Sequence, residues 1–162
     1  MSQLFSEDTV FISKQKEKEE VFKEIAGKLL ERKLVTSEYI NNLIEREKNY
    51  PTALSLSPID TSLPNIAIPH TESEYVTETR IVPVKLKYPI VFHNMILPDE
   101  EVTVSFLFMI LNHNESEQAG LLAGIMDFIN RQSISDLKVF LNLEDSHKIF
   151  DYLKQQDRKS VV

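Results

Sequence analysis

The stretch VTVSFLFMIL, residues 102–111, decides the fold class of this chain, because apolar side chains occupy both of its alternating faces. One face is expected to carry Val102, Val104, Phe106, Phe108 and Ile110, and the other Leu107, Met109 and Leu111. Successive side chains of a strand point to opposite faces, so a strand that is apolar on both is covered on both. The sequence therefore predicts residues 102–111 as the central strand of a sheet with helices on each face.

Helical patterns lie on either side of this strand in the sequence. In each of them apolar residues recur at the three- and four-residue spacing of a helix that packs one face against a core. Such helices are expected over residues 17–33 and 37–48, after a capping pair at Asn114 and Glu117, after Ser133, and over residues 145–154. This order of helices, strands and helices is typical of a domain that layers helices on a sheet.

Shorter strands are predicted over residues 9–12, 66–68, 79–86 and 89–93. The first would be an edge strand, and Pro83, which has no backbone N–H, places the third at an edge or a bulge. The segment 51–65 contains three prolines and several Ser and Thr residues, so it is expected to be a loop.

The whole chain, residues 1–162, is expected to form one α/β domain with a small mixed sheet flanked by helices on both faces. Its 162 residues, 42% of them hydrophobic, suffice for one core but not comfortably for two. The core is predicted to span about residues 9–154, and residues 1–8 and 155–162 are predicted to be loose termini.

Composition excludes several classes of function. The formal net charge of −7 leaves no basic stripe to displace counterions from phosphates, so nucleic acid is not expected as a partner. The absence of cysteine excludes disulfides, a thiolate nucleophile and a thiolate metal site. The first residues lack the pattern of a signal peptide, and no apolar run could cross a bilayer, so a cytoplasmic protein without membrane insertion is expected.

Motifs for common catalytic chemistry are also missing. The three glycines fall in helical patterns, so there is no glycine-rich loop for a nucleotide phosphate and no G-x-S-x-G elbow for a nucleophilic serine. The histidines, at positions 70, 93, 113 and 147, lack the spacing of a metal site, and neither a metal nor a cofactor is expected. His113 ends the central strand, where ligands of α/β sheets bind, and is therefore a candidate site residue.

The segment NIAIPHTE, residues 65–72, places His70 directly after Ile-Pro at the end of a short apolar run. Pro69 has a fixed φ and no backbone donor, so the imidazole leaves the sheet edge with little freedom. Two interpretations remain open from the residues alone. His70 is either a rigidly held reactive group or a hydrogen-bonded histidine in a turn, and residue type favours the second.

At IAIPH, residues 66–70, the chain resembles the enzyme IIA proteins of the bacterial phosphoenolpyruvate-dependent sugar phosphotransferase system, in the mannitol–fructose superfamily. LIEREKNYPTALSL (43–56) is similar to that family's segment with an Arg-Glu pair followed by Thr. PIVFHNM (89–95) and EEVTVSFLFMIL (100–111) resemble the galactitol-type branch in order and spacing. The resemblance runs from about residue 11 to residue 153 and implies the mannitol/fructose-type IIA fold.

The resemblance implies that His70 is the phosphorylated nucleophile and that Arg46, from the ERE segment, stabilises the phosphate and the transition state. A guanidinium offers paired donors to phosphate, which suits this role. Without the resemblance, Arg46 would be interpreted as a helix-surface residue that pairs with neighbours such as Glu45 and contributes little.

Supporting residues are suggested more weakly. Gln118 falls at or near the place of a second histidine that is common in the family, and its amide could donate to phosphate. His113 comes earlier in the sequence and is not an obvious substitute. Thr52 and Thr71 are candidate phosphate contacts, although most such threonines are turn residues.

The implied activity is that of a phosphotransferase with a phosphohistidine intermediate. HPr would give a phosphoryl group to His70, which would pass it to a IIB component that serves a membrane IIC permease, here in galactitol-type sugar uptake. Because two proteins would dock at the site in turn, the site is expected to be shallow. The alternative is a regulatory IIA-like protein, in which the phosphorylation state of His70 controls a partner. An inert binding domain with a fortuitous I-P-H is disfavoured by the length of the match.

Overall fold

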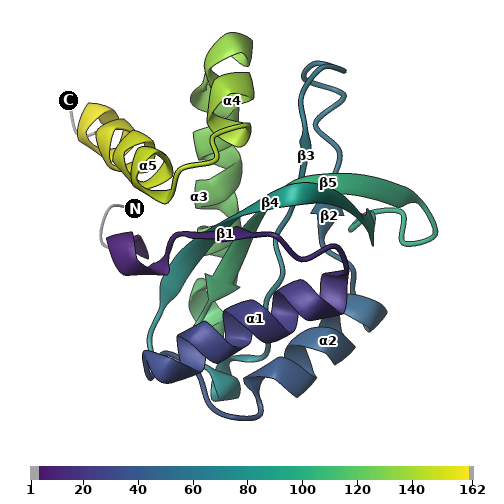
Figure 1. Ribbon diagram of the computed structural model, residues 1–162, viewed down its shortest axis with the longest axis vertical. Helices are drawn as coiled ribbons and strands as arrows, with labels where there is room; N and C mark the ends of the chain where they lie inside the picture. The colour runs from purple at the N-terminus through teal and green to yellow at the C-terminus, as the bar shows by residue number, and fades with distance from the viewer. Residues whose placement is uncertain (1–3, 161–162) are drawn as a thin grey trace.

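The computed structural model describes residues 4–160 and shows a five-stranded mixed sheet with helices on both faces (Figure 1). The strands are β1 (Phe11–Ser13), β2 (Ala53–Leu54), β3 (Asn65–Ala67), β4 (Arg80–His93) and β5 (Glu101–Leu111). The helices are α1 (Lys18–Glu31), α2 (Tyr39–Asn49), α3 (Gln118–Arg131), α4 (Ile134–Leu141) and α5 (Ser146–Ser160). Short 3₁₀ helices are η2 (Glu7–Thr9), η3 (Ser73–Tyr75) and η4 (Glu115–Glu117). The prediction of a single α/β domain with a mixed sheet is confirmed.

The strand order is β1-β4-β5-β3-β2, so the predicted central strand does lie in the middle of the sheet. β4 and β5 form a long antiparallel pair, and β1 and β3 run parallel to β4 and β5 respectively. β2 closes the other edge antiparallel to β3; with only two residues it was too short to recognise within the predicted loop 51–65. Because β3 and β5 are parallel, their carboxyl ends lie at the same edge of the sheet.

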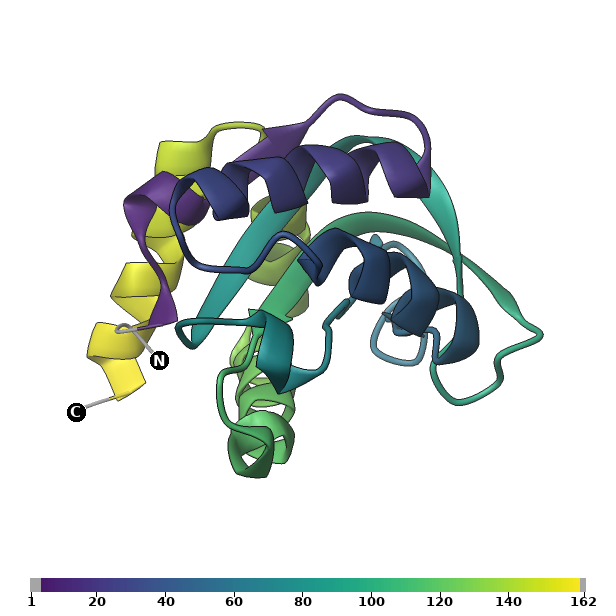
Figure 2. The same cartoon turned by 90° about the horizontal axis from the view of Figure 1, so that it is seen from below.

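Two hydrophobic clusters cover the two faces of the sheet. α1 and α2 lie side by side on one face, where Phe22, Ile25 and Leu43 are completely or almost completely buried (Figure 2). α3, α4 and α5 contribute to the cluster on the other face, which contains Phe108 and Phe140. The long β4–β5 pair contributes side chains to both clusters, as expected for strands that are apolar on both faces.

The alternation of side chains between the two faces of the sheet is interrupted once along β5. Val102 and Val104 pack with α1 and α2, whereas Phe106 and the residues after it on that face, Phe108 and Ile110, pack with α3–α5. The pairing register shifts at Ser105 on both sides of the strand, from Ile90 to Lys85 in β4 and from Asn65 to Ile66 in β3. An extra residue in a strand exchanges its two faces, so the predicted common face for all five residues is wrong.

The two predicted strands 79–86 and 89–93 form one strand, β4, with an irregular register between Lys85 and Ile90. β4 as a whole lies inside the sheet, but its first part is paired only with β5, so the expected edge position holds for Pro83. It is opposite Phe108 of β5, while β1 pairs with β4 only from Val84 onward. A missing N–H is tolerated here because the short neighbour β1 does not extend along the strand as far as Pro83.

The ends of the chain contain more order than predicted. Phe5, in the segment expected to be loose, is 8% exposed and joins the cluster under α3–α5. α5 was expected over residues 145–154 and continues to Ser160, while residues 1–3 and 161–162 lie outside the described part of the chain. Across residues 4–160, no helix combines the length and the apolarity needed to cross a bilayer.

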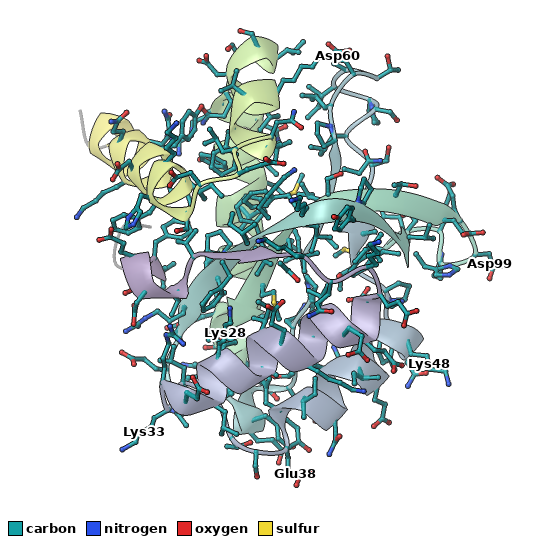
Figure 3. The ribbon with its side chains drawn as sticks, in the orientation of Figure 1. Lys28, Lys33, Glu38, Lys48, Asp60 and Asp99 are labelled. Carbon is teal, nitrogen blue, oxygen red and sulfur yellow. The ribbon has the colours of Figure 1, made fainter. Side chains whose placement is uncertain are left out.

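Of the two predicted helix caps, one is found in the structure. Ser133 caps α4 as predicted, with its side chain accepting from the backbone N–H of Asp136. Asn114 instead caps η4 by accepting from Ser116, so it forms no capping box with Glu117 at the start of α3. Charged side chains such as Lys33, Glu38 and Asp99 are exposed and point outward at the periphery (Figure 3).

Candidate functional site

His70 stands at the edge of the sheet where β3 and β5 both end. The carbonyl of Pro69 accepts a hydrogen bond from the backbone N–H of Ile110 at 3.0 Å, and His70 forms an isolated bridge with the same residue. Pairing with β5 therefore continues past β3 as far as the histidine. The backbone of His70 is held by the central strand, and Pro69 restricts the torsion before it.

The imidazole of His70 has one nitrogen engaged. Its Nδ1 lies 3.0 Å from the carbonyl oxygen of Ile68. A carbonyl can only accept, so Nδ1 donates its hydrogen and Nε2 carries the lone pair. The backbone two residues earlier thus selects the tautomer, and Nε2 is the nitrogen available to attack an electrophile.

Burial lowers the pKa of His70 below its ordinary value of 6.5. The nearby positive charge of Arg46 lowers this pKa as well, whereas the bond to the carbonyl of Ile68 acts in the opposite direction. At neutral pH the ring is therefore uncharged, as a nitrogen nucleophile requires.

His70 lines an open depression of about 210 Å³. Its other lining residues come from the end of α2, the segment after β3, the position after β5, η4 and the start of α3: Arg46, Thr71, Glu72, Ser73, Asn112, Glu115 and Gln118. Segments far apart in the sequence therefore meet around the imidazole. Three predicted site residues besides His70, namely Arg46, Thr71 and Gln118, lie in this lining.

Arg46 is a cation without an anionic partner among the described side chains. Its Nε atom is buried and has no hydrogen-bond partner in the described part of the chain. The guanidinium carbon lies 4.7 Å from the centre of the Tyr50 ring, a cation–π contact that orients the group. The expected alternative, an ion pair with Glu45, does not form, so the guanidinium donors are available to an anion in the depression.

Gln118 lines the same depression as His70, and its side-chain oxygen accepts from Nδ2 of Asn112 at 2.9 Å. Thr71 is 5% exposed, and its hydroxyl donates to the carbonyl of Glu72 at 2.9 Å. Asn112, Glu72 and the other acidic lining residue, Glu115, were not among the predicted site residues. The signal for Asn112 was its position, since it is the first polar residue after the apolar run of the central strand.

Thr52 and His113 are placed elsewhere. Both side-chain oxygens of Glu47 accept from Thr52, one from its backbone N–H at 2.8 Å and one from its hydroxyl at 2.7 Å. His113 is exposed, and its Nδ1 donates to the carbonyl of Val76 at 2.8 Å. Neither residue lines the depression around His70.

A larger cavity, of about 400 Å³, lies between α1, the end of α2 and the β4–β5 connection. It is lined in part by Lys18, Glu47, His93 and Asp99, whose charges have mixed signs. Among the described residues, no group of three or more His, Asp or Glu side chains is placed to hold a metal ion. The neutral Nε2 of His70 beside a guanidinium is therefore the strongest reactive arrangement, and it suits an electrophile that carries negative charge.

Comparison with known proteins agrees with this geometry. A sequence profile described as "Phosphoenolpyruvate-dependent sugar phosphotransferase system, EIIA 2" matches residues 3–156. No curated protein matches the chain.

Solved structures share the fold over nearly the whole chain. The mannitol IIA of Escherichia coli has a TM-score of 0.70 at 20% identity, with 92% of this chain and 98% of that chain covered. The nitrogen regulatory protein IIA-Ntr of Neisseria meningitidis has a TM-score of 0.64 at 18% identity, with 94% and 97% covered. The Escherichia coli complex of mannitol IIA with phosphorylated mannitol IIB gives 0.58 at 22% identity, with 92% and 97% covered.

Proposed function

The chain belongs to the EIIA 2 family of the phosphoenolpyruvate-dependent sugar phosphotransferase system, and from this membership we propose that it is a galactitol-type IIA component. It takes a phosphoryl group from phospho-HPr on His70 and passes it to a IIB component, which serves a IIC permease in the membrane. The observation that carries the proposal is the lone pair on Nε2 of His70 in a depression that also holds the unpaired cation of Arg46.

In the transfer step, the Nε2 lone pair of His70 attacks the phosphorus of the phosphohistidine on the donor protein. A new P–N bond forms, and the P–N bond of the donor breaks with its electron pair returning to the donor imidazole. The donor ring, protonated on its other nitrogen, becomes neutral, and the ring of His70 takes up the positive charge. Its Nδ1 keeps its hydrogen, which the carbonyl of Ile68 accepts at 3.0 Å in the unphosphorylated chain. In transfer to the IIB component, a nucleophile of that protein attacks the phosphorus, the P–Nε2 bond of His70 breaks, and its electron pair returns to the ring of His70, which becomes neutral again.

Arg46 and Gln118 supply donors for the phosphoryl oxygens. Phosphoryl transfer passes through a loose transition state with negative charge spread over three oxygens. A fixed donor at such a charge typically contributes about 3 kcal/mol. The guanidinium of Arg46 has no competing ion pair among the described residues, so it can engage these oxygens without first breaking an ion pair.

The shape and charge of the surface favour a protein as donor and acceptor. The depression is open and small, about 210 Å³, which suits the side chain of a docked protein better than an enclosed sugar. The acidic residues Glu72 and Glu115 in its lining favour basic partner surfaces. A IIB partner is further supported by the complex of mannitol IIA with phosphorylated IIB, whose IIA chain has the same fold.

The first test is reconstitution with phosphoenolpyruvate, enzyme I and HPr. We expect intact-mass spectrometry to show one acid-labile phosphoryl group on the protein and none on His70→Ala. An adduct that persists on His70→Ala would reject the assignment of the nucleophile.

Arg46→Ala should slow this phosphorylation by about 10²- to 10³-fold, the usual effect of removing one donor from a developing anion. Lys48→Ala is the matched control, because Lys48 is an exposed cation of the same helix that does not line the depression. Equal rates for the two variants would remove Arg46 from the mechanism. Unfolding curves of both variants should stay close to that of the wild type.

The sugar branch and the relay role are tested by onward transfer. Phosphorylated protein is mixed with galactitol-type and mannitol-type IIB components, and loss of label from His70 is followed. Faster transfer to the galactitol-type component is the expected result. Failure to transfer to any IIB component would favour the regulatory alternative over the relay.

A further inference from the structure

Asn112 is a buried polar residue directly after β5, and the transfer step described above assigns it no role. It is 3% exposed, and its side-chain amide lies between two partners. The backbone N–H of Asn114 is 3.1 Å from Oδ1 of Asn112, and Nδ2 of Asn112 is 2.9 Å from Oε1 of Gln118. Because water cannot substitute freely at so buried a group, both contacts hold the amide in place.

These contacts determine which way the amide of Gln118 faces. A backbone N–H only donates, so the atom of Asn112 that faces Asn114 must be the oxygen. The NH₂ group of Asn112 therefore faces Gln118, and Gln118 must present its oxygen in return. The NH₂ group of Gln118 is left for the depression, and it has no partner among the hydrogen bonds of the described residues.

The direction of this amide sets the sign of the local electrostatic potential. With its N–H groups toward the depression that His70 also lines, Gln118 attracts phosphoryl oxygens; turned over, it would present a carbonyl oxygen and repel them. The difference matters because the depression already contains the carboxylates of Glu72 and Glu115, against the single cation of Arg46. A preoriented donor also avoids reorganisation during the reaction.

We propose that Asn112 is a positioning residue for phosphoryl transfer, which holds Gln118 so that its amide N–H, and not its carbonyl oxygen, faces the phosphoryl group on His70. The proposal rests on the function proposed for His70. Gln118 donates a hydrogen bond to a non-bridging phosphoryl oxygen, and neither amide makes or breaks a covalent bond.

A purely structural role for Asn112 makes a different prediction. An Asn side chain that accepts from the backbone two residues later is a common turn element, and such a turn needs only the oxygen. Aspartate would serve that turn equally well. The contact with Gln118, in contrast, uses the nitrogen, so Asn112→Asp keeps the turn and reverses the amide of Gln118.

We expect Asn112→Asp to slow phosphorylation of His70 by about 10²- to 10³-fold in kcat, the effect of losing one oriented donor. KM for phospho-HPr should be unchanged, because docking is not altered. In nuclear magnetic resonance spectra, the side-chain amide signals of Gln118 should shift on phosphorylation in the wild type and not in Asn112→Asp.

A double-mutant cycle separates this mechanism from the added charge. In the Gln118→Ala background, Asn112→Asp should cause little further slowing if it acts through Gln118. Equal slowing by Asn112→Asp in both backgrounds would mean that charge or structure is responsible, and this would overturn the proposal.

Phosphoramidate, a small molecule that phosphorylates histidine, tests the positioning role without HPr. If the wild type reacts with phosphoramidate at His70 but not with phospho-HPr, the relay is rejected, and the comparison with Asn112→Asp still decides the positioning role. Equal rates for wild type and Asn112→Asp with both donors would reject the positioning role and leave the relay standing. No adduct on His70 from either donor would reject both.

Discussion

Within one segment, residues 66–70, the backbone both holds His70 in position and fixes the tautomer of its ring. The carbonyl of Pro69 joins the histidine to the central strand, and the carbonyl of Ile68 holds the hydrogen on Nδ1. In both contacts the acceptor is a main-chain carbonyl, so neither contact depends on the identity of a neighbouring side chain. The nitrogen that keeps the lone pair, Nε2, is therefore selected by the path of the chain.

Glu47, the residue after Arg46, is a second buried titratable group. Its side chain is 3% exposed, and burial raises its pKa from 4.5 to about 7, even though the two hydrogen bonds from Thr52 act in the opposite direction. Between pH 4.5 and pH 7 the folded state therefore binds a proton at Glu47 that the unfolded state has released. The contribution of Glu47 to stability is therefore greatest below this window and is lost as the pH rises through it.

We predict that the free energy of unfolding decreases by up to about 3 kcal/mol across this window because of Glu47, at about 1.4 kcal/mol for each pKa unit. Glu47→Gln keeps a partner for both groups of Thr52 and should flatten the dependence. Urea unfolding at several pH values measures it, with the exposed Glu45→Gln as the control. A dependence equally steep in Glu47→Gln and the wild type would contradict the assignment.

Among the elements, α1 ends in a motif that usually contains glycine. The N–H of Lys33 donates to the carbonyl of Leu30 at 3.0 Å, and that of Leu34 donates to Leu29 at 3.1 Å, which together form a Schellman motif. Lys33 has a φ of 61°, the one positive value at a non-glycine residue in the described chain. A residue with a Cβ atom is strained in this conformation by about 1 kcal/mol or more.

Lys33→Gly should therefore stabilise the domain, by about 0.5–1 kcal/mol once the greater entropy of glycine in the unfolded chain is included. Thermal and urea unfolding would measure the gain. Lys28→Gly, inside the same helix, is the control and should destabilise by about 1 kcal/mol. If Lys33→Gly is destabilising too, the strain at this position is not relieved by glycine.

In β4 and β5, the periodicity of apolar residues does not predict the register of strand pairing. A strand with one extra residue at Ser105 still reads as an apolar run, because both of its faces are buried. The extra residue can be recognised only from the pairing partners, because Val104 and Phe106 lie opposite the adjacent residues Asn65 and Ile66 of β3. For the same reason, the edge position of Pro83 within β4 depends on the length of β1, a different part of the chain.

On the scale of the whole molecule, the two hydrophobic clusters share β4 and β5 and should unfold together. Phe22 lies in the cluster under α1 and α2, and Phe140 lies in the aromatic group under α3–α5, with its ring centre 5.3 Å from that of Phe128. Each side chain is 1% exposed or less. Damage on either face is therefore transmitted through the same strands.

Phe22→Ala and Phe140→Ala should each lower the free energy of unfolding by about 3–5 kcal/mol. Far-ultraviolet circular dichroism should show a single transition in both variants, at lower urea than in the wild type. Val139→Ala, at a position 63% exposed beside Phe140, should change stability by about 0.5 kcal/mol or less. Two separate transitions in either phenylalanine variant would show that the faces unfold independently.

The sequence alone was sufficient to predict the α/β class, the central strand and the helical layers. Through resemblance it also pointed to His70 and Arg46, which the fold brings to one depression. Burial on both faces and helical spacing are local patterns, and local patterns survive without knowledge of the fold. Only the tertiary structure determines the tautomer of His70, the contact of Asn112 with Gln118 and the hydrogen bonds of Thr52 to Glu47. Each depends on which atoms meet across distant segments or a tight turn, and neither residue type nor periodicity contains that information.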